Sequence, residues 1–367
     1  MRESIDGASF AQAMIHAAAS LNLQKQQINE LNVFPVPDGD TGTNMSLTLG
    51  TAAAELRKRQ PHTVGEAAAT NASALLRGAR GNSGVILSLL FRGFAKAVKD
   101  KDSIDGRDLA IALDFGVAAA YKAVMKPAEG TILTVSRLTA ARAADAARQT
   151  PNDPEAVLEA AIAEGQPALE HTTEMNPVLK KAGVVDAGGK GFLVILQGML
   201  DSLRGVPMPE GDGKGEAKVE SKTDYAAIAA EEITFTFDTV FIVRKTSPHK
   251  GLEAFEAYLN SIGDSLVIGE DDESFKVHVH TDTPGEALTA AQRYGTLELA
   301  KIENMRTQAA DLAADRKAQS TDDLDAIEAE LEQAEQAEVP AEKRYGFLAV
   351  CAGDGLAGAF RDLGVDR

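Results

Sequence analysis

The residues from 32 to 45, NVFPVPDGDTGTNM, carry functional groups whose types and spacing could do chemistry. Asp38 and Asp40 stand one residue apart in a Pro/Gly turn, and the amide of Asn32 lies upstream of them. Oxygen ligands grouped in this way suit a hard divalent cation, and Mg2+ held by one or two carboxylates commonly also binds phosphate. The pattern predicts that Asp38 and Asp40, together with Asn32, bind Mg2+ in a nucleotide-dependent phosphoryl transfer.

The same Pro-Asp-Gly-Asp sequence is also an ordinary β-turn, because Pro fixes φ, Gly accepts positive φ and Asp bonds to its own backbone. Two neighbouring features favour a binding site. Pro35 and Pro37 stiffen the approach to the loop. Thr41, Thr43 and Asn44 follow it where a helix would begin, so their polar groups could donate hydrogen bonds to anionic oxygens.

Three further glycine-containing segments could contribute to the same site, namely RGNSG at 80–84, EGTILT at 129–134 and VDAGGKG at 185–191. In the first of them, backbone N–H groups around Asn82, Ser83 and Gly84 could bind phosphate, with the Ser hydroxyl as an added donor. A tight turn between two helices has the same composition. The sequence contains no Gly-x-x-x-x-Gly-Lys-Ser/Thr motif, which excludes a P-loop.

Together, these four segments resemble the signature of the kinase domain in the catalytic subunit of bacterial fatty acid kinase. That domain is similar to the nucleotide-binding L subunit of dihydroxyacetone kinase. The resemblance implies that Asp38 and Asp40 are catalytic and bind Mg2+, and that Asn32 stands where related kinases have an Asp ligand. It also implies a set of residues that contact ATP: Thr41, Thr43, Asn44, Asn82, Ser83, Gly84, Thr131, Asp186 and Gly188.

Composition restricts the partners of the chain. Its 367 residues include 37 basic and 55 acidic side chains, a net charge of −18. This balance excludes nonspecific nucleic-acid binding, which needs a basic face, and a polybasic membrane anchor. One cysteine, no signal-peptide layout and no long apolar run predict a cytoplasmic protein without a transmembrane segment or an internal disulfide. The sequence leaves a homodimer open.

Helical periodicity dominates residues 1–205, where for example Phe10, Met14 and Leu21 share one face. The pattern predicts an all-α bundle, and the resemblance implies a barrel of about eight antiparallel helices with the nucleotide site at one end. Residues 206–224 are rich in Pro, Gly, Lys and Glu, which is typical of a linker.

A different pattern follows the linker. Alternation from 233 to 242, a helical stripe from 252 to 259 and an apolar hairpin around an acidic turn predict a small α+β domain at 225–312. Residues 313–343 are acidic and poor in apolar side chains, which predicts a second linker. Residues 344–367 read as one strand and the start of one helix, which we interpret as a fragment of a third, α/β domain that the chain truncates.

The segment KVHVHT at 276–281 contains a second candidate site. On a strand His278 and His280 point to the same side, so both imidazoles could bind one metal ion. The segment resembles the middle domain of the same family, where two His and a Cys are thought to bind zinc. Asp238 stands where the Cys is expected. Asp238, His278 and His280 are therefore candidate Zn2+ ligands, with a metal-free cluster as the alternative.

The resemblance implies an ATP- and Mg2+-dependent kinase that phosphorylates a fatty acid delivered by a separate fatty-acid-binding carrier protein. A dihydroxyacetone-type kinase fits the Asp loop equally well, but this chain has no recognisable subunit for holding that substrate. A nucleotide- or lipid-sensing scaffold without turnover is the third alternative. The intact pair Asp38 and Asp40 argues against such a scaffold, since a sensor does not need the metal.

Overall fold

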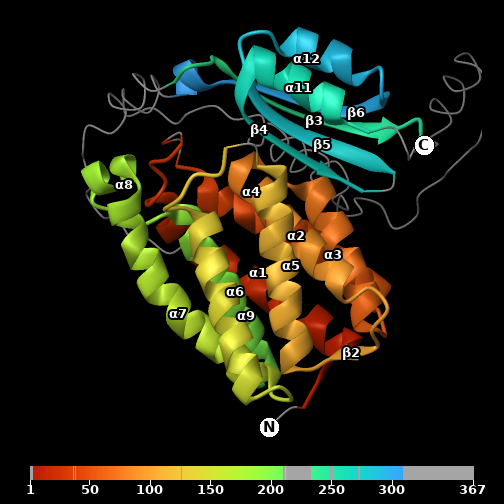
Figure 1. Cartoon of the computed structure of the whole chain (residues 1–367), viewed down its shortest axis with the longest axis vertical. Helices are drawn as coiled ribbons and strands as arrows, with labels where there is room; N and C mark the ends of the chain where they lie inside the picture. The colour runs from red at the N-terminus through yellow and green to blue at the C-terminus, as the bar shows by residue number, and fades with distance from the viewer. Residues whose placement is uncertain are drawn as a thin grey trace, which may run out of the picture. The chain divides into compact units, whose positions relative to one another are not determined.

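The computed structural model describes residues 3–35, 37, 39–124, 126–209, 211, 233–247, 251–271 and 273–308 (Figure 1). All of them belong to one unit that extends from Met1 to Gln319. Asp38 lies outside the described residues. So do most of the predicted linker at 206–224, the predicted linker at 313–343 and the predicted fragment at 344–367, and these predictions stay as stated.

The helical domain contains nine helices in the part of the chain that is described. They are α1 (Gly7–Asn29), α2 (Thr41–Arg59), α3 (Val64–Gly78), α4 (Gly81–Ala97), α5 (Gly106–Ala123), α6 (Ile132–Gln149), α7 (Pro154–Met175), α8 (Pro177–Ala182) and α9 (Ala187–Leu203). From α1 to α7 each helix packs against the next, and α9 packs against both α7 and α1. The ring therefore closes into a barrel of eight long helices, with α8 as a single short insertion. This confirms the predicted helical barrel.

The barrel core consists of the apolar stripes that the sequence displays. Phe10, Met14 and Leu21 of α1 and Ile195 of α9 are buried together with apolar residues from the other long helices. Burial of these stripes supplies most of the favourable free energy, since about 25 cal/mol is gained for each square ångström of apolar surface removed from water. Helix propensity alone would not hold helices of this length in water.

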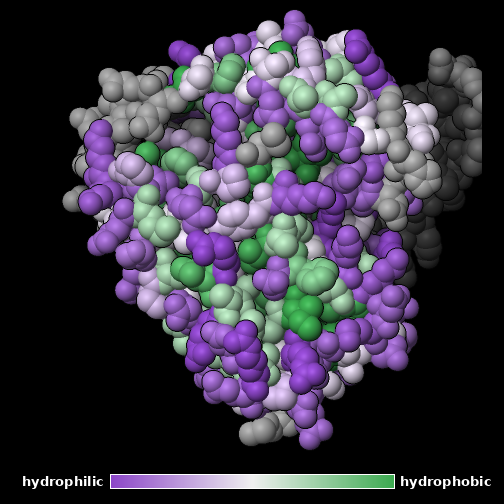
Figure 2. Space-filling view, viewed as in Figure 1, coloured by the Kyte–Doolittle hydropathy of each residue, from purple (hydrophilic) through white to green (hydrophobic). Residues whose placement is uncertain are grey.

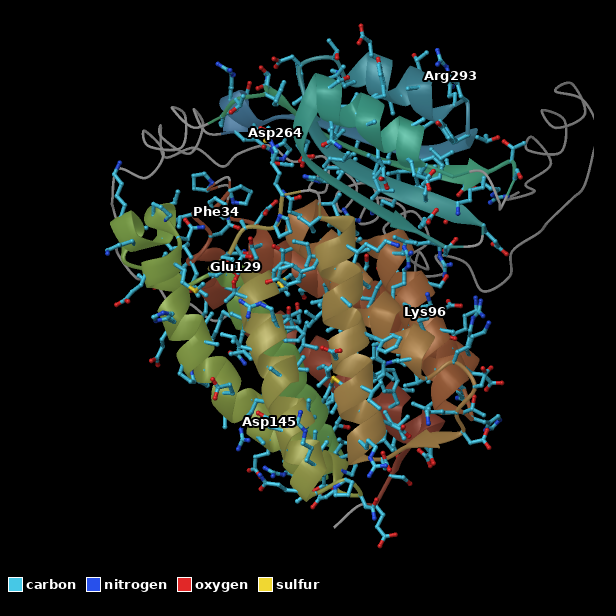
Figure 3. All side chains as sticks on the ribbon, viewed as in Figure 1. Phe34, Lys96, Glu129, Asp145, Asp264 and Arg293 are labelled. Atoms are coloured by element: carbon cyan, nitrogen blue, oxygen red, sulfur yellow. The ribbon has the colours of Figure 1, made fainter. Side chains whose placement is uncertain are left out.

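The alternating chain direction decides which helix ends meet. Because the chain reverses between successive long helices, α2, α4 and α6 begin at the same end of the barrel. α7 ends at this end, where the short α8 also lies, so α9 begins there as well (Figure 1). In Figure 3, Phe34 and Glu129 lie at this end of the helical domain and Asp145 lies at the other end.

The helical domain also includes a short pair of strands, which the sequence did not predict. The strand β1 (Ile5–Asp6) pairs antiparallel with β2 (Ser103–Ile104). Two residues are too few to show alternation, so the sequence carries no strand signal here. Ile5 and Ile104 are both buried, and this small ladder attaches the chain start to the turn before α5.

The described residues of the second domain form a four-stranded antiparallel sheet with helices packed against it, which confirms the predicted α+β class. Its strands are β3 (Phe237–Lys245), β4 (Gly263–Glu270), β5 (Ser274–Thr281) and β6 (Gly295–Asn304), in the order β4-β5-β3-β6. Its described helices include α11 (Glu253–Ile262) and α12 (Pro284–Ala291), and Pro284 lies in the first turn of α12. The sequence did not indicate β6, an edge strand whose residues are largely exposed and include several charged ones.

The two faces of the sheet have different partners. Phe241, Phe275, Val277 and Val279 point to one face and form a core with residues of α11 and α12, including Phe255. The alternate residues of β5 point to the other face. On that side β4 contacts α4 and α5, and Val267 is part of the core of the helical domain. The sheet therefore places its polar β5 residues toward the helical domain.

Hydrophilic side chains dominate the face of the protein drawn in Figure 2, with small hydrophobic areas between them. This surface agrees with the large negative net charge. Among the described residues, no helix has both the length and the apolar character that crossing a membrane requires.

Candidate active site

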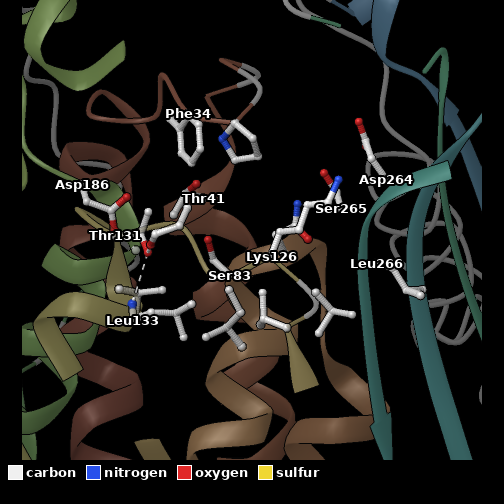
Figure 4. A pocket seen from close by; sticks show the side chains of 18 of the residues that line it. Phe34, Thr41, Ser83, Lys126, Thr131, Leu133, Asp186, Asp264, Ser265 and Leu266 are labelled. Atoms are coloured by element: carbon white, nitrogen blue, oxygen red, sulfur yellow. Dashed lines mark hydrogen bonds between the residues drawn. The ribbon is translucent and has the colours of Figure 1, made fainter. Parts of the chain in front are cut away.

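Four helix N-termini meet at a pocket of about 500 Å3 at one end of the barrel (Figure 4). The first turns of α2, α4, α6 and α9 each contribute lining residues. The lining that these turns and the residues just before them supply comprises Thr41, Asn82, Ser83, Thr131, Ile132, Leu133, Asp186 and Gly188. Helix N-termini carry partial positive charge and oriented N–H groups, so their convergence favours a polyanionic ligand.

The four N-termini are not equivalent. Thr131 caps α6 by accepting a hydrogen bond from the Leu133 N–H at 3.4 Å, and Asp186 caps α9 by accepting one from the Gly189 N–H at 2.7 Å. The N-cap residues of α2 and α4, Asp40 and Arg80, do not cap their helices with their side chains. In α2 the Asn29 amide oxygen instead accepts the Thr43 N–H, and the remaining first-turn N–H groups that no side chain caps are those with which a helix start binds phosphate.

Small residues let the starts of α4 and α9 approach each other. A Cβ atom placed on Gly188 would lie 3.3 Å from the Asp186 carboxylate and 3.5 Å from the Ser83 hydroxyl. Gly81 begins α4 with φ at +56°, a conformation that glycine adopts without steric cost. The RGNSG and VDAGG segments are far apart in the sequence, yet they form one wall of the pocket.

The Asp loop lies at the start of α2. The Thr41 hydroxyl donates a hydrogen bond to the amide oxygen of Asn32, and both residues are buried. Asp40 is the N-cap residue of the helix. Asn32 and Asp40 therefore both adjoin Thr41, and neither is among the residues that line the pocket. The third predicted ligand, Asp38, lies outside the described residues.

Three predicted ATP-binding residues support the pocket wall without lining it. Asn29 accepts a hydrogen bond from the Thr43 N–H at 3.0 Å and donates one to the Thr43 hydroxyl at 2.9 Å. A Cβ atom on Gly81 would lie 2.6 Å from the Asn44 amide nitrogen, and one on Gly84 would lie 2.5 Å from the Thr48 hydroxyl. Thr43, Asn44 and Gly84 thus fix how α2 and α4 begin.

A hydrogen-bond network that the sequence does not reveal holds the loop before α6. The Glu129 carboxylate accepts hydrogen bonds from the Thr134 hydroxyl at 2.7 Å, the Arg137 guanidinium at 2.8 Å and the Tyr121 hydroxyl at 2.9 Å. The three donors belong to two different helices, so no local spacing could indicate them. The network fixes the loop that carries Thr131 into the pocket. Lys126, also in this loop, adds a positive charge to the lining.

Burial raises the pKa of the Asp186 carboxyl to about 6, although its hydrogen bonds from the backbone N–H groups of Gly189 and Ile132 act in the opposite direction. Because the folded pKa lies above the ordinary value, the unfolded chain loses this proton first as the pH rises. The stability contributed by this group is therefore present at low pH and is lost between about pH 4 and pH 6.

We expect the Asp186→Asn variant to lack this pH dependence, since the amide oxygen can still accept the Gly189 N–H. Its unfolding free energy relative to the parent should rise by up to about 3 kcal/mol between pH 4 and pH 7. Chemical denaturation at several pH values measures this difference. Asp201→Asn, at the other end of α9, is the control and should leave the pH dependence unchanged. A difference between Asp186→Asn and the parent that stays constant with pH would contradict the interpretation.

The second candidate site forms as the sequence predicts in position. Asp238, His278 and His280 each offer one ligand atom, and these atoms lie within 4.8 Å of one another. The His278 Nδ1 atom is 3.3 Å from the Asp238 Oδ1 atom, and the two His Nε2 atoms are 3.2 Å apart. Both Asp238 Oδ1 and His278 Nδ1 are buried without a hydrogen-bond partner. Unpaired buried polar atoms are costly, which makes a shared cation at this cluster favourable.

The electrostatics of this cluster also suit a cation. Burial lowers the pKa of His278 well below its ordinary value, and positively charged neighbours act in the same direction, so its imidazole is neutral at pH 7. Burial raises the pKa of Asp238 to about 6. The Asp264 carboxylate lies 3.5 Å from His280 Nδ1, which orients the ring with Nε2 toward His278. Asp264 also lines the pocket described above, so the two sites share a residue.

Two protein families and several curated relatives match this chain. The DAK2 domain family matches residues 35–201, and the family of FakA-like middle domains of fatty acid kinase matches residues 234–312. Protein YloV of Bacillus subtilis (strain 168) is 39% identical over 369 residues, which cover 98% of this chain and 64% of the relative. Protein SH1689 of Staphylococcus haemolyticus (strain JCSC1435), which is uncharacterized, is also 39% identical over 369 residues, with 99% and 64% covered. The chain thus spans 64% of the length of these curated relatives.

Two solved structures are similar to part of the chain. The crystal structure of the dihydroxyacetone kinase of C. freundii in its native form has a TM-score of 0.39 and 21% identity, covering 53% of this chain and 34% of that one. The same kinase in complex with AMP-PNP and Mg2+ has a TM-score of 0.41 and 20% identity, covering 52% and 33%. The chain thus contains a DAK2 domain at residues 35–201, followed by a FakA-like middle domain of fatty acid kinase at residues 234–312.

Proposed function

We propose that this chain is the ATP-binding kinase subunit of a fatty acid kinase. It would transfer the γ-phosphoryl group of ATP to a fatty acid that a separate carrier protein delivers, giving an acyl phosphate. The observation that carries the proposal is the convergence of four helix N-termini on one pocket, lined by six of the residues assigned to ATP from the sequence. The order of the two matched domains supports the choice of a fatty acid as acceptor.

The residues at the start of α2 fit a bound Mg2+ ion. Asp40 supplies a carboxylate and Asn32 an amide oxygen beside Thr41, and these are oxygen donors of the kind that Mg2+ takes. We assign Asp38 to the same set from the sequence. Mg2+, when bound, would neutralise charge on the triphosphate and on the transferring group.

The chain's own groups would then position the reactants. The N–H groups at the starts of α2 and α4 would bind the phosphates, with the Ser83 hydroxyl and the Lys126 ammonium beside them. A carboxylate oxygen of the fatty acid would attack the γ-phosphorus as the bond to the ADP oxygen breaks. The acceptor carboxylate is already ionised at pH 7, so the reaction needs no general base. None of the described residues that line the pocket is a histidine, which fits this chemistry.

Transfer of label from γ-labelled ATP tests the proposal directly. The full chain would be incubated with Mg2+ and either a fatty acid loaded on a lipid-carrier protein or free dihydroxyacetone. We expect labelled acyl phosphate in the first reaction and no labelled product in the second. Label on dihydroxyacetone alone would replace the proposal with a triose kinase. ATP binding without transfer to either acceptor would favour a non-catalytic sensor.

We also propose that Asp238, His278 and His280 hold Zn2+. The 3.2 Å between the His278 and His280 Nε2 atoms is close to the separation of about 3.4 Å between ligands of a tetrahedral zinc with bonds near 2.1 Å, and one ligand atom from each of the three residues lies within 4.8 Å of the others. A site with one carboxylate and two imidazoles uses ligands that zinc accepts, and a water would complete it. The neutral state of His278 supports the assignment, because only a neutral imidazole has a lone pair for the ion.

Zinc analysis of purified variants tests this site. We expect about one zinc per parent chain and loss of that zinc in His278→Ala, because two ligands do not hold the ion. Asp264→Asn should weaken zinc binding by about 10- to 100-fold, since it removes the group that orients His280. His171→Ala, an exposed histidine of α7, is the control and should retain full zinc. Zinc-free parent protein after purification in zinc-containing buffer would contradict the proposal.

A further inference from the structure

The pocket at the end of the barrel has a second wall that comes from the middle domain. Opposite the helix N-termini it is lined by Asn260 of α11 and by the start of β4, Gly263 to Val267. In Figure 4, Asp264 and Ser265 of this wall face the side from which Thr41, Ser83 and Asp186 approach. The residues assigned to phosphate occupy only the first wall.

Contacts at both ends hold the second wall against the helical domain. Val267 forms an isolated antiparallel bridge with Val124, which directly follows α5. Lys276 of β5 is buried and donates a hydrogen bond from Nζ to the carbonyl of Ala79, just before the RGNSG segment. A Cβ atom on Gly269 would lie 2.7 Å from the Leu76 side chain, so β4 approaches α3 closely. These contacts fix the second wall to the helical domain.

The backbone of the wall is irregular where it meets the pocket. The register between β4 and β5 shifts between Asp264 and Val267, which is a β-bulge. Within the bulge Ser265 has φ at +53°, a conformation that costs a non-glycine residue free energy. Bulges redirect side chains and are common beside functional sites.

The chemistry of the two walls differs in a way that matches the two halves of a nucleotide. The helix N-termini suit phosphates. Ile86 and Leu133 of the helical domain and Leu266 of the middle domain give the pocket an apolar lining, as a flat base requires, and Asn260 and Ser265 add polar groups from the middle domain. Hydroxyl and amide groups can hydrogen-bond to a ribose or to the edge of a base.

We propose that the middle domain binds the nucleoside half of ATP, with Asn260 and Ser265 as the residues that hydrogen-bond to its ribose or base. This inference rests on the proposed function, because it places ATP in this pocket. It makes the middle domain part of the nucleotide site, so the helical domain binds the triphosphate and the middle domain determines which nucleoside is accepted.

Calorimetric titration of the full chain with two ligands tests the inference. The ligands are MgATP and magnesium tripolyphosphate, which share the phosphates and differ in the nucleoside. We expect Ser265→Gly and Asn260→Ala each to weaken MgATP binding by about 2- to 10-fold, the effect of one lost hydrogen bond. Tripolyphosphate binding should stay within about twofold of the parent. Glycine tolerates the backbone at 265, so the first variant keeps the bulge; should it fail to fold, Asn260→Ala carries the test.

Two further variants make the outcomes distinct. Ser83→Ala should weaken the binding of both ligands, because Ser83 lies in the first wall, which is assigned to the phosphates. Ser261→Ala, next to Asn260 but outside the pocket lining, should change neither. If Ser83→Ala weakens both ligands while Ser265→Gly and Asn260→Ala leave MgATP unchanged, the inference is wrong and the proposed function stands. A change in fatty-acid KM instead of ATP affinity would also overturn it. If the parent binds neither ligand, the proposed function fails as well.

Discussion

Asp40→Ala is expected to lower kcat for phosphoryl transfer by about 10³-fold while the helical domain stays folded. Loss of one charged ligand removes stabilisation of the charge that develops on the transferring group, and such groups are worth this much in preorganised sites. The Asp40 side chain does not cap α2, so its removal does not cost that helix an N-cap. Initial rates with saturating ATP and loaded carrier protein measure the effect.

Asp145→Ala is the matched control for this substitution. Asp145 is an exposed carboxylate of α6 that pairs with Arg148 at 2.8 Å, at the end of the helical domain away from the pocket (Figure 3). It should leave kcat unchanged. Asp38→Ala is expected to behave as Asp40→Ala does, on the sequence assignment. If Asp40→Ala keeps more than about a tenth of the parent kcat, the metal assignment at this loop is wrong.

Gly81→Ala is expected to lower kcat/KM for ATP by about 100-fold. The new Cβ would lie 2.6 Å from the Asn44 amide nitrogen, so the Asn44 side chain or one of the two helix starts must shift. Displacements of about 1 Å in groups that position reactants can cost about this factor. The φ of +56° adds strain of about 1–2 kcal/mol for any residue with a Cβ. Steady-state kinetics with varied ATP, together with thermal unfolding, separate the two effects.

Gly183→Ala separates strain from displacement. Gly183 ends α8 with φ at +69°, and a Cβ there would meet no atom within 4 Å. The Gly183→Ala variant should lower the unfolding free energy by about as much as backbone strain alone does in Gly81→Ala. It should keep the parent kcat/KM. An equal fall of kcat/KM in the two variants would show that general destabilisation, rather than the geometry of the first wall, explains the effect of Gly81→Ala.

The helical domain could be predicted from the sequence because its signals are local. The apolar stripes of α1 and α9 repeat at helical spacing within single segments, and the same residues form the core. The first wall of the pocket could be predicted for a related reason. Thr41, Ser83, Thr131 and Asp186 each lie at or just before a helix start that carries its own glycine-containing motif.

The second wall of the pocket could not be predicted in the same way. Val124 meets Val267, and Ala79 meets Lys276, across long stretches of chain, and neither pair has a local pattern that indicates contact. The bulge at Ser265 interrupts a strand without a glycine or proline to mark it. The edge strand β6 was also missed, because its charged, exposed residues weaken the alternation on which strand prediction depends.

Sequence spacing predicts only part of the histidine cluster. His278 and His280 could be placed on one face because the side-chain period of a strand is two residues. Asp238 pairs with His280 in the β3–β5 register, which brings it to the same face. The unpaired nitrogen of His278 and the contact of Asp264 with His280 depend on the folded sheet and required the structure.

The measurement that tests the central claim most directly is calorimetric titration of ATP into the full chain with and without Mg2+. The claim is that acidic and amide oxygens at the start of α2 hold the cation that joins the triphosphate to the pocket. It predicts that Mg2+ tightens ATP binding in the parent chain and has no such effect in Asp40→Ala. Equal ATP affinity with and without Mg2+ in the parent chain would contradict it.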